Sequence, residues 1–456
     1  RDLDSSLVGS EMCIRDSDIY VCNYDAANLL YINQGNGEFL EQAKLWGLDI
    51  VDASHMPSIC DYDLDGDLDI YLQVNRYMDE QQYTPKDLFY VKDGVEVLRP
   101  DVKRLFHIVR HPNKAQQVNM WIGREDRLLR NEGPGNKFSD QSKQMGIRRG
   151  DTLSATWWDY DHDGWPDLYV CNDLAAPDRL FHNNQDGSFT NVALEALPHT
   201  PWAAMGSSAG DVNNDGLVDF LAADMAFRTH YKDKVFMGNM ATKFNNISFF
   251  AGDQLMRNAL YINTGTPHFQ EAAFMAGVGS TDWTWTAKLA DLDGDGRLDA
   301  YFTNGTPVSL TVSEKALAML SNSSTVDTGS LRELHQDMPP VLERNLVYQN
   351  QGQLSFEDRS ADWGLDYEGM SFAAVHVDLD RDGDLDMVVA NIDAPPHVYR
   401  NNSTQNHLQV QLRGKQSNRF GIGCELILET NGGKQTRQVY PVDGFQSCQE
   451  AIVHFG

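Results

Sequence analysis

The stretch that decides the fold is residues 61–69, Asp-Tyr-Asp-Leu-Asp-Gly-Asp-Leu-Asp, an acidic nonapeptide with the pattern D-x-[DN]-x-D-G-x-x-D. The pattern recurs at residues 159–167, 211–219, 291–299 and 378–386. The third copy carries Asn213 where the others carry aspartate. One motif repeated at intervals of tens of residues is typical of repeat architectures, in which a single structural unit is copied.

A second motif, an aliphatic-aromatic step that ends in asparagine, lies between the copies. From this asparagine to the first aspartate of the next copy the distance is always 28 residues. The five pairs are Asn33–Asp61, Asn131–Asp159, Asn183–Asp211, Asn263–Asp291 and Asn350–Asp378. A sixth step ends at Asn401 and has no acidic copy after it. The constant spacing indicates one folded unit rather than five coincidences.

Short β-rich runs surround each acidic copy. Ile70-Tyr-Leu72 and Leu168-Tyr-Val170 are examples of the run that follows it. The run before the copy, the asparagine step and the segment after that step supply three more strands. Four strands per unit, repeated around a ring, predict an all-β protein with a β-propeller over residues 1–401. Residues 402–456 do not follow the repeat pattern, and we expect a small separate β domain there.

The charge balance excludes some classes of partner. The 456 residues carry 66 acidic and 37 basic side chains, a formal net charge of −29. The electric field of so negative a chain repels nucleic acid and anionic membrane surfaces and attracts cations. No apolar run approaches the ~18 residues of a membrane-spanning helix, so neither nucleic-acid binding nor membrane insertion is expected.

The acidic copies have the ligand spacing of a calcium loop. Oxygen atoms at positions 1, 3, 5 and 9, with a backbone carbonyl at position 7, can surround one Ca²⁺ ion, which prefers six to eight oxygens. The glycine at position 6 permits the left-handed backbone of a tight turn. Position 12 falls in a strand, so these are strand-loop-strand sites rather than helical EF-hands. Without metal they would be ordinary acidic turns, whose crowded like charges would destabilise the fold or raise pKa values.

We therefore predict about five calcium ions and no catalytic residues. The predicted ligands are Asp61, Asp63, Asp65, Asp67 and Asp69; Asp159, Asp161, Asp163, Trp165 and Asp167; Asp211, Asn213, Asp215, Leu217 and Asp219; Asp291, Asp293, Asp295, Arg297 and Asp299; and Asp378, Asp380, Asp382, Asp384 and Asp386.

On these residues the chain resembles the FG-GAP or VCBS repeat propellers of the integrin type. Its tail resembles the ASPIC/UnbV domain, through Asn406–Leu412, Ser417-Asn-Arg419, Gly421-Ile-Gly423 and Val453–Gly456. That domain follows such repeats in cartilage acidic protein and its bacterial relatives. The resemblance implies an exported, calcium-binding, seven-bladed propeller, of which six repeats can be traced here. We expect a fragment truncated at both ends, from a secreted, periplasmic or cell-surface protein.

One segment departs from the repeat. Asp18–Asn23 matches Asp167–Asn172, so a loop should begin at Ser10, yet that register lacks the aspartates and the glycine. Residues 6–17 resemble translated sequencing-adapter sequence, which indicates an assembly artefact; a diverged, metal-free loop is the alternative. No ligand is assigned there.

A partner is expected on the rim opposite the acidic loops. Long insertions at 73–126, 223–257 and 303–344 follow second strands, and insertions gathered on one face commonly form a functional surface. Their apolar side chains either bind a partner or pack as a lid over the channel. Those side chains are Trp121, Met225, Phe236, Met237, Phe249 and Phe250.

Three functions fit this sequence. The first is a non-enzymatic extracellular calcium-binding propeller that mediates adhesion by binding a protein or glycan. The second is an enzyme or accessory protein of secondary metabolism that uses the insertion face. A structural spacer is the third. Fold does not fix function, so the choice of ligand rests on the resemblance alone.

Overall fold

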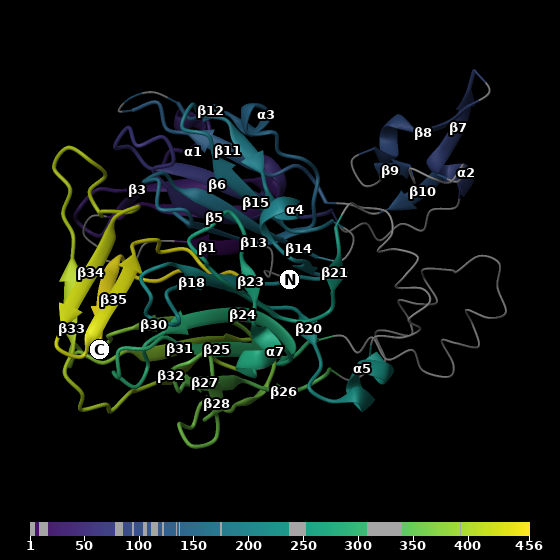
Figure 1. Ribbon diagram of the computed structural model, residues 1–456. Coiled ribbons are helices and arrows are strands. Elements are labelled where there is room, and N and C mark those ends of the chain that lie inside the picture. Colours follow the sequence, from purple (N-terminus) through teal and green to yellow (C-terminus); the bar gives the residue numbers. More distant parts are fainter. Residues whose placement is uncertain are drawn as a thin grey trace.

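The computed structural model describes residues 5–8, 17–77, 85–93, 95–103, 107–110, 117–120, 123–133, 135, 137–173, 176–236, 252–307, 340–392 and 394–456. Strands dominate this part of the chain, and its helices are short (Figure 1). The all-β prediction is confirmed, and the succession of curled antiparallel sheets agrees with a β-propeller.

Six antiparallel units follow one another, each with its strands in sequence order, and pairing of residues 24–27 with residues 51–53 joins the first two units into one eight-stranded sheet. The first three are β1 (Ser5–Val8), β2 (Ile19–Ala27), β3 (Leu29–Asn33) and β4 (Phe39–Glu41); β5 (Val51–Cys60), β6 (Asp69–Val74), β11 (Arg127–Arg130) and β12 (Ser139–Asp140); and β13 (Thr152–Trp158), β14 (Asp167–Asn172), β15 (Arg179–Asn183) and β16 (Phe189–Asn191).

The other three are β18 (Ser207–Gly210), β19 (Asp219–Ala222), β22 (Ala259–Ile262) and β23 (Gln270–Glu271); β24 (Asp282–Ala290), β25 (Asp299–Asn304), β27 (Leu346–Asn350) and β28 (Phe356–Asp358); and β30 (Ser371–Val377), β31 (Asp386–Asn391) and β32 (His397–Tyr399). The four-strand unit expected from the sequence is present in five of these six units, whereas seven blades stay a prediction. The artefact proposed for residues 6–17 also stays a prediction, since residues 9–16 lie outside the described part.

A one-turn helix after the fourth strand is a repeated feature that the sequence analysis missed. Four units carry it, as α1 (Ala43–Trp46), α3 (Ser142–Met145), α4 (Ala193–Ala196) and α7 (Ala273–Ala276). Three of these helices end at a glycine with a left-handed backbone, Gly47, Gly146 and Gly277, at φ of 75°, 75° and 88°. Such a glycine satisfies the last carbonyls of a helix at little steric cost, and it is the sequence signal that could have revealed the turn.

Adjacent tryptophans on β13 hold three units together. Neighbouring residues of a strand point to opposite faces of its sheet. Trp157 accordingly packs edge-on against Tyr71 of β6, with ring centroids 6.3 Å apart. Trp158 packs against Phe220 of β19 on the other side, at 4.9 Å. Both indoles are buried, so the core lies between the units.

The described elements of the insertions lie on one side of the molecule (Figure 1). They contain α2 (Pro85–Leu88), β7 (Phe89–Lys92), β8 (Val95–Leu98), η1 (Pro100–Val102), β9 (His107–Arg110), β10 (Gln117–Met120), β20 (Met225–Ala226), α5 (His230–Phe236), β21 (Gln254–Leu255) and β26 (Glu343–Arg344). Two further short strands, β17 (Thr200–Pro201) and β29 (Glu368–Gly369), pair with β21 and β26.

The apolar insertion residues are only partly described. Met225 is buried with Leu153, Trp283 and Phe445, so it packs inside the protein and presents no surface. Trp121, Met237, Phe249 and Phe250 lie outside the described residues, as does the side chain of Phe236.

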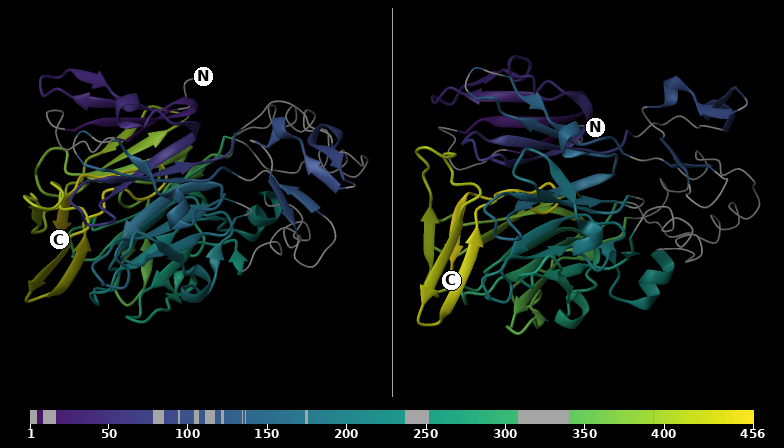
Figure 2. Two further views of the ribbon diagram at one scale, coloured as in Figure 1. Left: turned by 90° about the horizontal axis from the view of Figure 1, so that it is seen from above. Right: turned by 45° about the horizontal axis from the view of Figure 1, so that its top comes forward.

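The C-terminal residues form a separate small β unit. Strand β33 (Leu408–Gln411) pairs with β36 (Ile452–Phe455), and β34 (Glu425–Thr430) forms a hairpin with β35 (Gly433–Gln438). Their apolar side chains pack around Val439, Val453 and Phe455. These strands lie on the side of the molecule away from the insertions, in Figure 1 and in both views of Figure 2.

Trp158→Ala should lower the free energy of unfolding by about 3–5 kcal/mol, because it removes a large buried side chain and leaves a cavity between units. Chemical denaturation of the full chain would measure the loss. Leu45→Ala, at an exposed position of α1, should change the midpoint little. An equal effect of both substitutions would contradict this description of the core.

Candidate metal centre

Each acidic loop connects the first and second strands of a unit, so all five lie on the same rim. The aspartate at position 9 is the first residue of the second strand in every case and is buried: Asp69, Asp167, Asp219, Asp299 and Asp386. Its carboxylate is thus held by the sheet, whereas the other carboxylates belong to the turn.

The loop backbone takes the left-handed conformation twice. The expected position is the glycine at position 6, where φ ranges from 85° to 104°. The second position, 4, was not expected, because it is occupied by Leu64, His162, Asn214, Gly294 and Arg381, at φ of 57° to 74°. A left-handed side-chain residue costs on the order of 1 kcal/mol, and its recurrence shows that the turn geometry imposes it.

Backbone N–H groups orient the carboxylates. The position 6 amide donates to the position 1 carboxylate, as from Gly216 to Asp211 at 2.9 Å. The position 2 amide donates to the position 9 carboxylate, as from Val212 to Asp219 at 3.0 Å. The same pair of bonds is present in all five loops. The loops are therefore one preformed structure repeated.

The asparagine at the end of the third strand binds the loop of its own unit and the loop of the unit before it. Asn263 donates its backbone N–H to Asp219 at 2.8 Å, and its side-chain amide to the carbonyls of Val218 and, in the preceding unit, Tyr160. Asn183, Asn350 and Asn401 make the same three bonds. Each asparagine thus ties its own loop to the loop of the unit before it.

Carboxylate oxygens converge in the loops. Groups that lie within 4.8 Å of one another are Asp61, Asp63 and Asp65; Asp159, Asp161 and Asp163; Asp291, Asp293 and Asp295; and Asp378, Asp380 and Asp386. In the third loop the side-chain amide nitrogen of Asn213 instead donates a hydrogen bond to Asp215 at 2.9 Å. Groups of carboxylate oxygens this close together suit a hard divalent cation such as Ca²⁺, which prefers oxygen ligands. The role of each predicted ligand, including the position 7 carbonyls, stays a prediction.

Burial makes four of the position 9 carboxylates hard to ionise without a cation. It raises the pKa of Asp69, Asp219 and Asp299 to about 8, and that of Asp167 to about 7. Neighbouring aspartates raise each pKa further, while the N–H donors oppose the shift. A bound divalent ion would reverse the effect, because its charge favours the carboxylate form.

The residue before each asparagine also approaches a loop, which the sequence analysis did not foresee. Arg130 pairs with Asp63 at 3.0 Å, and Arg400 pairs with Asp380 at 2.7 Å. Gln349 contacts Asp293, whereas the third loop has the apolar Ile262 at this position. At this position the first and fifth loops therefore carry a cation that the third and fourth loops lack, although the fourth loop pairs Asp295 with its own Arg297.

The C-terminal unit is docked on the acidic loops. Asn418 donates to Asp61 at 3.3 Å, Gln409 donates to Asp378 at 2.6 Å, and Gln438 makes two bonds with the backbone of Asp159. Burial lowers the pKa of the half-buried Arg437, and the charges of Asp291 and Asp211 oppose that shift. All five loops thus interact with this unit.

A segment of the C-terminal unit lies between the first strands of the propeller units. Asp443 forms an ion pair with the buried Lys288 of β24 and accepts a hydrogen bond from Ser208 of β18. Phe445 packs against Trp285 of β24 at 4.9 Å and against His55 of β5 at 5.2 Å. The segment from Asp443 to Phe445 therefore occupies the centre of the propeller.

A polar cavity of about 540 Å³ remains at this junction. His376, Asp378, Arg437, Asp443 and His454 are among its lining residues. The cavity lies beside the loops and the C-terminal unit, away from the insertions.

Two family models match the chain. The FG-GAP-like repeat matches residues 15–72, 159–222 and 248–302, and the ASPIC and UnbV domain matches residues 414–456. No curated protein matches.

Solved structures give weak likenesses. A lectin of Agrocybe aegerita, described as recognising non-reducing terminal N-acetylglucosamine, is 14% identical over 87% of this chain and 80% of its own, with a TM-score of 0.38. A Bacillus licheniformis rhamnogalacturonan lyase is 12% identical over 92% and 73%, at 0.29. The Photorhabdus luminescens Tc holotoxin pore is 13% identical over 84% and 16%, at 0.28. Likenesses at this level carry no argument about ligand or activity.

The metal-free protein should lose stability as pH rises from about 5 to 8. An unfolded aspartate has a pKa near ~3.9, whereas Asp69, Asp219 and Asp299 are raised to about 8. Between these values the folded state binds more protons, so stability is full below the lower pKa and is lost through the upper one. We expect the melting temperature of metal-stripped protein to fall by about 5 °C or more.

Calcium should remove most of that pH dependence, raising the melting temperature more at pH 8 than at pH 5, because at low pH it must displace protons. Scanning calorimetry at both pH values, with and without calcium, measures the difference. A metal-stripped protein that becomes more stable towards pH 8 would contradict the assignment.

Lys288→Met should destabilise the protein by about 3–5 kcal/mol, because Asp443 would be left buried without its counter-charge. The double variant Lys288→Met with Asp443→Leu should recover most of the loss, since no unpaired charge remains. Chemical denaturation of the wild type and the two variants measures these differences in stability. If the double variant is as unstable as Lys288→Met, the loss does not come from an unpaired charge on Asp443, and the ion pair does not hold the segment from Asp443 to Phe445 in place.

Proposed function

Because this chain combines FG-GAP-like repeats with an ASPIC and UnbV domain, we propose that it is a non-enzymatic, extracellular, calcium-binding β-propeller that mediates adhesion by binding a protein or glycan. The observation that carries the proposal is the ring of five preformed loops, each with a buried aspartate at position 9. A fold that buries so many carboxylates on one rim needs cations to neutralise them.

About five Ca²⁺ ions fill these loops in our proposal. They would bring the formal net charge from −29 to −19 and so relieve the repulsion along the rim. Weak calcium loops stay occupied at the millimolar calcium of extracellular fluid, which supports an extracellular setting. None of the described helices is long and apolar enough to cross a membrane.

The partner would bind at the insertions. The loop rim is covered by the C-terminal unit, through contacts such as those of Asn418 and Gln438 with the loops. On the insertions, by contrast, Val91 and Tyr231 expose 70% and 75% of their surface. Exposed apolar side chains on a projecting segment are suited to contact a protein or the face of a sugar ring. An enzyme of secondary metabolism would use the same face and is the alternative.

A glycan and protein array probed with the full chain, in calcium and after chelation, tests the proposal. We expect calcium-dependent binding that Val91→Asp with Tyr231→Ser lowers at least about tenfold, since the changes disrupt the proposed contact surface. Val398→Asp, at a position of β32 that is 64% exposed, is the matched control. A silent array together with turnover of a small metabolite would overturn the binding role.

A further inference from the structure

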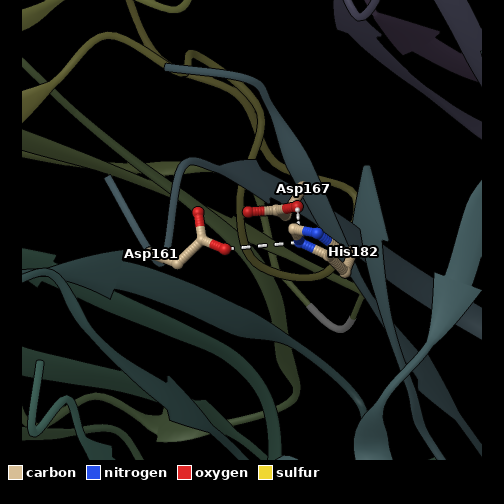
Figure 3. Close-up of side chains that lie close together, drawn as sticks. All are labelled: Asp161, Asp167 and His182. Carbon is tan, nitrogen blue, oxygen red and sulfur yellow. Dashed lines mark ion pairs between the residues drawn. The ribbon is translucent and has the colours of Figure 1, made fainter. Parts of the chain in front are cut away.

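The second acidic loop differs from the others in having a histidine beside it. His182 lies on β15, directly before Asn183, and its ring points towards the loop (Figure 3). Its Nδ1 atom is 3.4 Å from Oδ2 of Asp161 and 3.3 Å from Oδ1 of Asp167. The three ligand atoms lie within 4.8 Å of one another.

These nitrogen–oxygen distances are close to the separation between two ligands of one metal ion. A hydrogen bond between a ring nitrogen and a carboxylate is usually about 2.7–3.2 Å long, and the Nδ1 atom of His182 lies slightly farther than that from each of the two carboxylates with which it forms ion pairs. Ligands about 2.0–2.1 Å from a tetrahedral zinc ion are separated by roughly 3.3–3.4 Å. The two nitrogen–oxygen separations therefore match those between ligands of one small ion, and one ligand atom from each of the three residues lies within 4.8 Å of the others.

The surroundings hold the three ligands in place. Asp167 is buried, and it accepts hydrogen bonds from the backbone N–H groups of Asn183 and Tyr160. The ring of Tyr160 meets the ring of His182 edge-on at 6.0 Å. Supporting contacts of this kind orient the ligands of a metal site. In the same loop Asp163 is engaged by Gln185 at 2.8 Å, which draws that carboxylate towards a different partner.

The equivalent positions of the other loops offer no such ligand. They are occupied by Arg130, Ile262, Gln349 and Arg400. An arginine is always protonated, isoleucine has no donor atom, and an amide offers only another oxygen. A neutral imidazole nitrogen is a poor ligand for calcium but a preferred one for zinc and related ions.

We propose that the second loop, with His182, Asp161 and Asp167 as ligands, binds a borderline transition-metal ion of the Zn²⁺ class, while its sister loops bind calcium. The inference rests on the proposed function in that the loops hold cations, but it assigns this one loop a different metal. The remaining coordination positions are left to water or to the other loop carboxylates.

The test loads metal-stripped full-length protein with Co²⁺, a spectroscopic substitute for zinc, in the presence of millimolar Ca²⁺. We expect one equivalent of Co²⁺ to stay bound, to give visible d–d absorption and to be displaced by Zn²⁺. His182→Gln, which introduces the residue found at position 349, should weaken Co²⁺ binding by about 100-fold or more and keep the stabilisation by calcium. His162→Asn, which introduces the residue found at position 214 of the third loop, is the matched control and should bind Co²⁺ as the wild type does.

Equal Co²⁺ affinity of wild type and His182→Gln, or displacement of Co²⁺ by millimolar calcium, would overturn the inference. Crystals of the wild type soaked in Zn²⁺ give a second reading that does not depend on the folding of a variant. An anomalous zinc peak between His182, Asp161 and Asp167 supports the site, and its absence there overturns it. Cobalt retained through His182 in a protein that calcium does not stabilise would overturn the calcium proposal and still support this one.

Discussion

The burial of one aspartate at the start of every second strand is the constraint on which the rest of the structure depends. Asp219 shows it plainly: the carboxylate is buried and accepts N–H groups from Val212 and Asn263. Two hydrogen bonds orient a carboxylate but do not supply a counter-charge, and an unneutralised buried charge is among the most costly features a fold can contain. The oxygens of positions 1, 3 and 5 gather at the same place, so neutralisation by a divalent ion would serve the whole loop.

The loops also connect the propeller units to each other and to the C-terminal unit. The asparagine amides run from each loop to the one before it, as from Asn263 to Tyr160. Gln438 and Gln409 tie the C-terminal unit to the second and fifth loops, and Asp443 reaches Lys288 at the centre. A change in the charge of a loop would therefore be felt at contacts far from it in sequence, because they share the same carboxylates and backbone groups.

Local pattern was sufficient to predict part of this arrangement. The acidic spacing, the glycine at position 6 and the short apolar runs predicted the loops, and the order of four strands is confirmed by the pairing. The left-handed residue at position 4 has no sequence signature, since Leu64 and Arg381 share nothing but their place in the turn. The recurring asparagine was visible, but its role lies in bonds such as that from Asn263 to Tyr160, which join separate units.

The contacts of the C-terminal unit were beyond sequence reasoning for the same physical reason. Nothing near Asp443 indicates that its partner is Lys288, because the pair forms only when the tail folds back over the propeller. The proximity of His182 to Asp161 and Asp167 likewise arises from the pairing of β14 with β15. Side chains brought together by sheet register become visible only in three dimensions.

The most direct test of the central claim is to count the ions. Full-length protein equilibrated with millimolar calcium and passed through a metal-free column can be analysed for bound metal by mass spectrometry under native conditions. We expect about five divalent ions per chain, lost together with folded structure on prolonged chelation. A fully folded protein that carries none would contradict it.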